Sequence, residues 1–354
     1  MPTLPVNTDG AVLYYEDSGV PDNANDYTTI IIFHGFIFHG ASFRLLFRYA
    51  SLHNLRIVAV NHREYPGSSP LSEREIANVW SPEPNQQTTA LREQAMELAV
   101  FIARFIELED IPPPVTVDGK KTGGVGCLAW SQGCGPFLSL LANISRMDIH
   151  VSTLLERYMR TVFLYDPPCI VLGIPFPPGV TTPIHDPDLL DEEKPQKFID
   201  WISSYFNPLS TPESITDEAL RRRYNMYEKT GDERYRAVSL RLKKAELNSI
   251  VSPEIFPRIG VMLAYAREVY DDALQNALFD TKGQWNHLRT VAICPDMTIW
   301  TCNLSHRVLS DMLANSPTVG KVRRTVEMVT LRNANHTYHF TEPEKFIHLL
   351  TSYM

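Results

Sequence analysis

The segment Ala129-Trp130-Ser131-Gln132-Gly133 constrains this chain more than any other feature. An apolar, β-rich run (125–128) leads into it, and a helix-like run (134–141) follows at once. A serine on a sharp turn between strand and helix needs small residues on either side, because the helix must pack close to the strand. Ala129 and Gly133 supply them. The pattern predicts an α/β sheet with Ser131 at a strand end.

Apolar segments alternate with helix-like segments over much of the chain, which predicts a mostly parallel central sheet flanked by helices. The predicted strands are 12–16, 28–33, 56–60, 125–130, 161–165, 297–301 and 325–331. The predicted helices around them are 42–51, 88–108 and 342–352.

The alternation of strand-like and helix-like segments stops between residues 167 and 286, where a proline-rich stretch precedes predicted helices at 188–206, 216–249 and 257–279. A helical block inserted between two strands of such a sheet is typical of a lid over a site at the strand ends. We therefore expect an α/β core made of residues 1–166 and 287–354, and a helical lid of residues 167–286.

Composition narrows the possible partners. The net charge of −8 argues against undirected attraction to nucleic acid or to an anionic membrane. The five cysteines form no C-x-x-C pair, so neither a zinc site nor a disulfide scaffold is indicated. No signal-like or membrane-spanning segment is visible, so a cytoplasmic protein is expected. The pattern leaves the oligomeric state open.

A serine hydroxyl is a poor nucleophile unless a histidine accepts its proton and a carboxylate orients that histidine. On this kind of sheet the expected order along the chain is serine, acid, histidine. His336 follows the last predicted strand and is the favoured base. His339 competes with it but lies nearer the final helix, which makes the reach to Ser131 less natural.

The acid is harder to assign. The loop after the predicted strand 297–301 contains no carboxylate, and Asp311 lies in a helix-like segment that is expected to face solvent. Asp166 ends the strand 161–165, and the prolines that follow it restrict its loop. Asp166 is therefore the favoured acid, and a serine–histidine dyad without an acid is the alternative.

An acyl-transfer site also needs N–H groups directed at the developing negative charge. One is expected from the backbone of Gln132. The other is expected from Phe36, in a loop (33–40) whose glycines allow close backbone approach. For His34 in the same loop, we favour a structural role beneath the loop over a second catalytic base.

Three motifs together resemble those of the α/β-hydrolase superfamily, over nearly the whole chain. His34-Gly35-Phe36 resembles its oxyanion loop, the stretch 61–69 is similar to its D-x-R-G-x-G-x-S turn, and Ser131 and His336 match its nucleophile and base positions. Asn61, Glu64 and Ala129 depart from the family pattern. An acid at Asp166 is a minority placement, similar to that in some lid-bearing members, including fungal lactone hydrolases of the zearalenone-degrading kind. A serine nucleophile argues against epoxide hydrolases and haloalkane dehalogenases, which use aspartate.

These features predict a serine hydrolase that cleaves a carboxylic ester or lactone of an apolar or aromatic small molecule through an acyl-enzyme, with no metal or cofactor. The expected pocket residues are Phe38, Trp130, Tyr165, Trp201 and Tyr205, although the last two would equally suit packing of lid on core. Other chemistry on the same fold stays open: amide hydrolysis, acyl transfer, carbon–carbon bond hydrolysis, or a cofactor-free lyase or oxygenase reaction. A non-catalytic ligand-binding module is the remaining alternative.

Overall fold

The computed structural model describes residues 2–22, 25–117, 119–315 and 321–354. Its centre is an eight-stranded sheet in the order β1-β2-β4-β3-β7-β8-β9-β10. The strands from β4 to β10 are parallel, and β1 and β2 are antiparallel additions at one edge. The bounds are β1 Thr3–Pro5, β2 Val12–Asp17, β3 Thr28–Phe33, β4 Leu55–Val60, β7 Val125–Trp130, β8 Met159–Tyr165, β9 Arg289–Pro295 and β10 Val326–Leu331. A separate hairpin joins β5 (Val115–Val117) and β6 (Lys120–Thr122).

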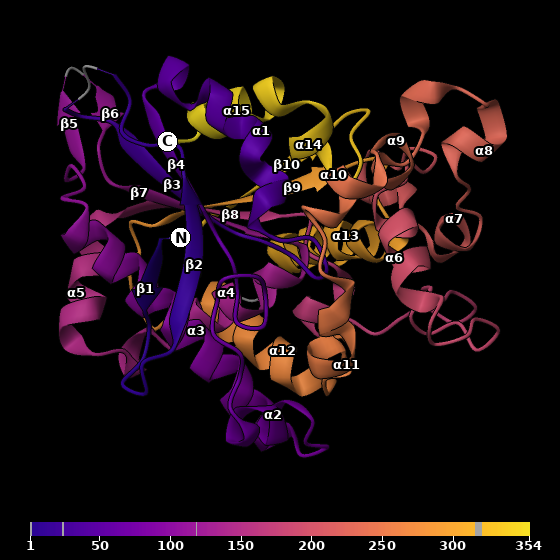
Figure 1. Cartoon of the computed structure of the whole chain (residues 1–354), viewed down its shortest axis with the longest axis horizontal. Coiled ribbons are helices and arrows are strands. Elements are labelled where there is room, and N and C mark those ends of the chain that lie inside the picture. The colour runs from indigo at the N-terminus through magenta and orange to yellow at the C-terminus, as the bar shows by residue number, and fades with distance from the viewer. Residues whose placement is uncertain (1, 23–24, 118, 316–320) are drawn as a thin grey trace.

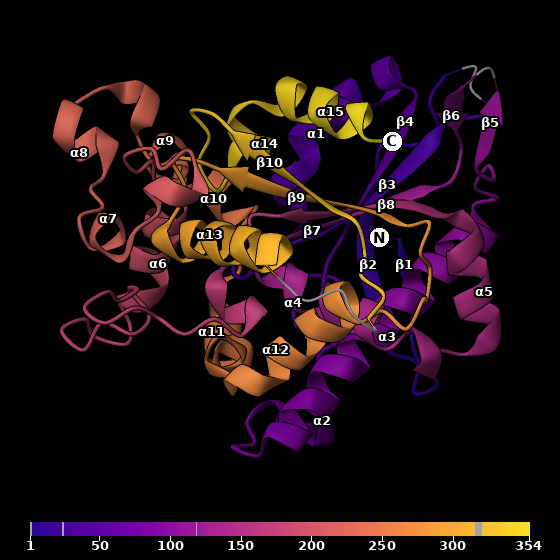
Figure 2. The ribbon, with the colours of Figure 1, turned by 180° about the vertical axis from the view of Figure 1, so that it is seen from behind.

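Helices cover both faces of this sheet, as Figures 1 and 2 show. On one face, α1 (Arg44–Ala50) packs with α15 (Pro343–Ser352), next to α14 (Tyr338–Thr341). On the other lie α3 (Pro84–Leu108), α4 (Cys134–Ala142), α12 (Arg267–Leu274) and α13 (Trp300–Asn315), bordered by α2 (Glu73–Val79) and α5 (Ile149–Tyr158). The mostly parallel sheet with flanking helices confirms the predicted fold class.

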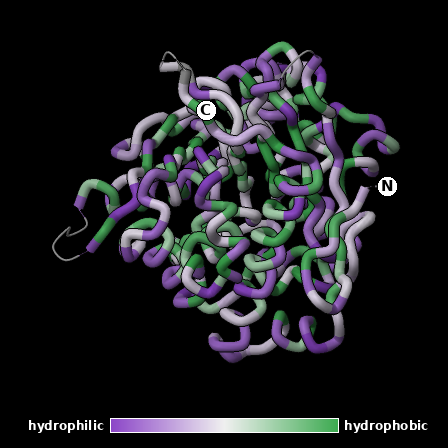
Figure 3. The backbone as a smooth tube through the Cα atoms, turned by 90° about the vertical axis from the view of Figure 1, so that its left-hand side faces the viewer, coloured by the Kyte–Doolittle hydropathy of each residue, from purple (hydrophilic) through white to green (hydrophobic). Residues whose placement is uncertain are grey.

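The core of the molecule is apolar. Strands β3, β4 and β7 are buried along their whole length, as expected for parallel strands covered on both faces. In Figure 3, green stretches recur through the middle of the molecule and purple ones are frequent along its outline. Among the described residues, no helix combines the length and the apolar character needed to cross a bilayer.

The segment 167–286 differs from the prediction. Its predicted long helices are broken into short ones: α6 (Lys194–Ile202), α7 (Asp217–Arg221), α8 (Met226–Thr230), α9 (Val238–Arg241), α10 (Lys244–Asn248) and α11 (Phe256–Ile259). Helices α6 to α10 lie at the end of the molecule toward which the β9 and β10 arrows point in Figure 1. Helix α12, however, packs against α3 and α4 in the layer that covers the sheet. The predicted lid range therefore includes a helix of the core layer.

One strand was predicted in the wrong place. Residues 297–301 do not form a strand: β9 is Arg289–Pro295, and helix α13 already begins at Trp300. Thr298 and Ile299 have β-branched side chains, but together with Met297 they form the short link between strand and helix. The shift matters because it moves the end of the strand to Pro295, directly before Asp296.

Candidate active site

Ser131 stands at the turn between β7 and α4. Its φ is +55°, a left-handed value that is strained for a residue with a side chain. A Cβ atom on Gly133 would lie 2.4 Å from the carbonyl oxygen of His34, and one on Gly35 would lie 2.7 Å from the Cβ of Ser131. Both glycines are thus required by close packing. Ala129 is accommodated within β7, between Phe33 and Leu164 of the neighbouring strands.

Three side chains from separate parts of the chain meet at this turn. The Oγ of Ser131 lies 2.9 Å from Nε2 of His336, and Nδ1 of His336 lies 2.6 Å from Oδ2 of Asp166. A carboxylate only accepts, so Nδ1 carries the proton and Nε2 is free to accept from the serine hydroxyl. The structure brings together the three residues that the sequence had singled out, in the arrangement of a nucleophile, a base and an orienting acid.

Asp166 is held from several sides. It is 2% exposed, its φ is +51°, and its N–H donates to Ile293 at the end of β9. The hydroxyl of Thr298 donates to Oδ2 at 2.5 Å, and the thiol of Cys302 donates to the Asp166 carbonyl at 3.2 Å. Burial and the charge of Asp166 raise the pKa of the Cys302 thiol well above its ordinary value, so this thiol stays protonated. Neither Thr298 nor Cys302 was singled out from the sequence.

Trp130 and Tyr165 were expected in the pocket, but neither is among the residues that line the cavity beside Ser131. They occupy matched positions at the ends of β7 and β8, are fully buried, and both donate to the backbone carbonyl of His336, at 3.0 Å from Nε1 and 3.2 Å from the hydroxyl. The Trp130 ring also packs 5.0 Å from the His336 ring. Their place is beneath the histidine loop, where they fix His336.

The competing histidines lie elsewhere. His339 is stacked on Phe43, with ring centroids 4.0 Å apart, and burial lowers its pKa well below the ordinary value, with a further contribution from His336. His34 donates from Nδ1 to the Gly35 carbonyl at 2.7 Å and accepts at Nε2 from the N–H of His62 at 3.1 Å. Burial likewise lowers its pKa well below the ordinary value. Both rings are therefore neutral, and His34 supports the loop from below.

The loop that carries Phe36 passes next to Ser131. Ile37 has a left-handed φ of +68°, and its N–H donates to the hydroxyl of Tyr65 at 3.1 Å. Within the described residues, the N–H of Phe36 donates to no protein acceptor. Gln132 lies at the start of a helical segment, where the first N–H groups have no acceptor within the helix. Two N–H groups thus remain free beside Ser131, at the residues expected from the sequence.

The inserted segment pairs with this loop. Phe38 forms a β-bridge with Val251, the N–H of Ser252 donates to Ile37 at 2.8 Å, and His39 donates to Ile250 at 3.0 Å. Phe38 is therefore covered by the insertion and packs on Trp130. Phe38 was expected in the pocket, but it is not among the residues that line the cavity beside Ser131.

A cavity opens beside Ser131, mostly lined by apolar side chains, among them Phe36, Ile170, Phe176, Phe198, Trp201 and Leu263. Trp201 thus lies where a pocket residue was expected. Tyr205 does not: it is buried, and its ring packs on Tyr235 and under the guanidinium of Arg241, both in the insertion. These contacts lie within the insertion.

The end of β9 carries a second buried aspartate. Asp296 directly follows the strand, is 2% exposed, and accepts from the hydroxyl of Ser210 at 2.7 Å and from the N–H of Ala334 at 3.4 Å. The expectation that this strand end has no carboxylate was therefore wrong, because the strand had been placed too late in the chain. Even so, His336 is hydrogen-bonded to Asp166.

Asp166, Cys302 and His336 also offer potential metal ligands, with donor atoms within 4.8 Å of one another. The hydrogen bonds among these groups account for that proximity. The raised pKa of the Cys302 thiol opposes the thiolate that a metal would need. The donor set suits a hydrogen-bonded histidine better than a cation.

The chain matches no model of a protein family, and no curated protein is similar enough in sequence to count as a relative. Among solved structures, the Cfl2 protein of Burkholderia cenocepacia is 15% identical, with a TM-score of 0.51, over 99% of this chain and 94% of its own. A candidate aryl esterase from the same organism is 13% identical, with a TM-score of 0.50, over 99% and 97% of the two chains.

These likenesses concern architecture. Together with the strand order and the turn at Ser131, they show that the chain has the α/β-hydrolase fold. What this chain does must come from its own site.

Proposed function

We propose that this protein is a serine hydrolase that cleaves a carboxylic ester or lactone through an acyl-enzyme. The observation that carries the proposal is the continuous hydrogen-bonded path from Ser131 through His336 to Asp166, with distances of 2.9 and 2.6 Å. A serine hydroxyl within hydrogen-bond reach of a histidine whose other nitrogen is held by a buried carboxylate is the arrangement that activates serine for acyl transfer.

In the proposed reaction, Ser131 Oγ attacks the substrate carbonyl carbon while His336 Nε2 takes the hydroxyl proton. The negative oxygen that results is bound by the N–H groups of Phe36 and Gln132. His336 then protonates the leaving alcohol, and the acyl group remains on Ser131. A water molecule, deprotonated by His336, attacks the acyl-enzyme and releases the acid, which restores Ser131. Asp166 stays ionised throughout and stabilises the protonated imidazole.

The lining of the cavity favours an apolar or aromatic substrate, because Phe36, Phe176 and Trp201 present rings beside Ser131. The cavity has a volume of about 40 Å³, and a single water molecule needs roughly 10–15 Å³ by the same measure. An aromatic ester needs more space than this. We therefore propose that the insertion acts as a lid that moves to admit substrate.

The decisive test is covalent labelling by a fluorophosphonate, read as intact mass. Wild type should gain one adduct, and Ser131→Ala should gain none while keeping a native circular-dichroism spectrum. Ser139→Ala, a buried serine on α4, is the matched control and should label like wild type. A folded wild type that gains no adduct at Ser131 would rule out the acyl-enzyme. Hydrolysis of aryl esters and lactones should then be measured on the same three proteins.

A further inference from the structure

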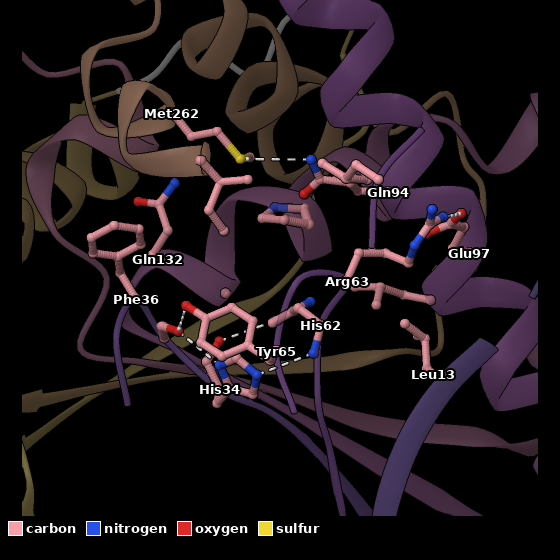
Figure 4. A pocket seen from close by; sticks show the side chains of 16 residues that line it. Leu13, His34, Phe36, His62, Arg63, Tyr65, Gln94, Glu97, Gln132 and Met262 are labelled. Carbon is pink, nitrogen blue, oxygen red and sulfur yellow. Dashed lines mark hydrogen bonds and ion pairs between the residues drawn. The ribbon is translucent and has the colours of Figure 1, made fainter. Parts of the chain in front are cut away.

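A second cavity lies on the other side of Phe36 and Gln132 from the catalytic one. Both cavities are lined by these two residues, and the second extends toward Tyr65, Gln94, Glu97 and Met262. Figure 4 shows Phe36 and Gln132 close together at one end of this cavity, with Gln94, Arg63 and Glu97 toward the other. The side chains next to the proposed oxyanion hole thus form a partition between two spaces.

The polar side chains deeper in the second cavity already have partners. Arg63 donates to the carbonyls of Ser69 and Pro70 and pairs with Glu75 and Glu97. The Tyr65 hydroxyl accepts from Ile37 and lies 3.4 Å from the Gly35 carbonyl. The Gln94 amide reaches the sulfur of Met262 at 3.6 Å. No charge is left unpaired among these groups, so the cavity offers nothing specific to an ionic ligand.

Gln132 is different. Its amide Nε2 lies 3.0 Å from the Tyr270 hydroxyl, and that hydroxyl lies 3.0 Å from the carbonyl of Met262. The carbonyl can only accept, so the single hydroxyl proton of Tyr270 is directed to it, and Gln132 must present its NH₂ to Tyr270. The amide orientation is thereby fixed, and the remaining Oε1 atom is buried with no hydrogen-bond partner among the described residues.

A buried acceptor without a donor is costly, and it favours any ligand that brings a donor to it. Gln132 is 8% exposed, directly follows the proposed nucleophile and forms part of both cavity walls. We propose that the Gln132 side chain is a specificity-determining group: its Oε1 accepts a hydrogen bond from a hydroxyl on a neutral substrate that reaches across the partition into the second cavity. The substrate class would then be hydroxylated esters or lactones, phenolic ones included. This inference rests on the proposed function, with Gln132 now acting through its side chain as well as its backbone.

Phe36 decides how the two spaces communicate. Its ring packs edge to face on Phe198 and Phe256, with centroids 6.0 and 5.7 Å away, and both of these residues belong to the insertion. Movement of the insertion would release the Phe36 ring and join the cavities. A substrate that needs both cavities would therefore use the same movement of the insertion that admits it to the catalytic cavity.

The test compares pairs of neutral aryl esters that differ by one hydroxyl, placed on the acyl side in one pair and on the alcohol side in the other. Wild type should prefer the hydroxylated member of one pair by about tenfold in kcat/KM, as expected for one buried hydrogen bond. In Gln132→Met this preference should disappear, so that the two members of the pair have equal kcat/KM; the ratio cancels any effect that the variant has on both members alike. Gln94→Met, the same substitution elsewhere in the second cavity, should keep the preference.

Two further experiments distinguish failure of this inference from failure of the proposed function. Tyr270→Phe removes the hydroxyl that fixes the amide orientation but keeps Oε1, so the preference should be smaller than in wild type and larger than in Gln132→Met; a loss equal to that in Gln132→Met would assign Gln132 a purely structural role. Calorimetric binding to Ser131→Ala should show the same preference without turnover, and the Ser131→Ala/Gln132→Met double variant should lack it. Equal binding of both members of every pair overturns this inference, even if wild type labels with fluorophosphonate and cleaves plain esters. Absence of labelling and of all hydrolysis overturns the proposed function instead, and the binding preference then decides whether Gln132 is a recognition group.

Discussion

The ends of β8 and β9 carry two aspartates that are alike in burial and position but have different hydrogen-bond partners. Asp166 and Asp296 each follow a strand, each is 2% exposed, and each donates its N–H to the next strand, at Ile293 and Leu331 respectively. The carboxylate of Asp166 meets Thr298 and His336. That of Asp296 meets Ser210 of the insertion and the backbone of Ala334. The aspartate after β8 thus serves the proposed chemistry, and the aspartate after β9 connects the insertion to the histidine loop.

The backbone accounts for much of this difference. Asp166 has a left-handed φ of +51°, which turns the chain sharply after β8. Asp296 lacks such a turn, and the chain runs on through Thr298 into α13. Burial and position at a strand end therefore do not distinguish the proposed triad acid from the other aspartate. The direction in which the carboxylate points does, and that direction depends on a local backbone conformation.

The most direct test of this difference replaces the carboxylate at the end of β8 by an amide. Asp166→Asn should lower kcat by about 10⁴-fold, because the amide no longer holds the imidazole in the correct tautomer or stabilises its charged form. Fluorophosphonate labelling should slow in parallel, and kcat on an aryl ester gives the magnitude. If Asp296→Asn instead caused the larger loss of activity, the assignment of the acid would have to move to β9.

At the end of β9, we expect a loss of stability. Asp296→Ala removes the acceptor of the Ser210 hydroxyl and of the Ala334 N–H, both in buried surroundings, so the free energy of unfolding should fall by about 1–3 kcal/mol. Denaturant titration measures it. Labelling of Ser131 should stay within about threefold of wild type at temperatures where the variant is folded. Asp296→Asn keeps one acceptor oxygen, so its free energy of unfolding should lie between those of wild type and Asp296→Ala.

The sequence predicts the end of β8 much better than that of β9. The strand 161–165 agrees with β8 (Met159–Tyr165) to within a few residues, and Asp166 was found because a strand-ending carboxylate next to prolines is a local signal. Thr298 and Ile299 favour strand by propensity alone, yet together with Met297 they form the link into α13. Asp296 and Thr298 were missed for that reason, although a strand placed at 289–295 would have revealed both.

The insertion and the aromatic residues show a second limit. Local helix propensity extends through 216–249, but the stretch is divided into short helices, with Asn225 capping the start of α8 and Gly231, at a φ of +68°, ending it. Trp130 and Tyr165 were assigned to a pocket because aromatic residues beside a nucleophile often form one. Their neighbouring positions in the sheet register instead place both under the carbonyl of His336. The placement of these two rings does not follow from local pattern, since it depends on segments far apart in the chain.

A smaller effect is expected at the hydroxyl that supports Asp166. Thr298→Val keeps the shape of the side chain and removes the donor 2.5 Å from Oδ2. One hydrogen bond to a charged group is worth about 1.5–3 kcal/mol, so kcat should fall by roughly ten- to a hundredfold, well short of Asp166→Asn. Thr290→Val on β9 is the matched control, because the Thr290 hydroxyl has no partner among the described residues. It should leave kcat unchanged, and an equal loss in both variants would assign the effect to the shape of the core.

The smallest effect concerns Cys302, which donates its thiol to the Asp166 carbonyl and lies 3.8 Å from His336 Nδ1. Burial and the nearby charge of Asp166 raise its pKa, so the reactive thiolate is scarce even when the pH approaches 9. Iodoacetamide should therefore leave Cys302 of the folded protein unmodified between pH 7 and about 9, as peptide mapping by mass spectrometry would show. Cys302→Ser retains a donor and should change kcat by less than about threefold, whereas Cys302→Ala should cost slightly more. Rapid alkylation at pH 7 accompanied by loss of activity would mean that the thiol is ionised and exposed, and that the end of β8 is more open than its packing around Asp166 indicates.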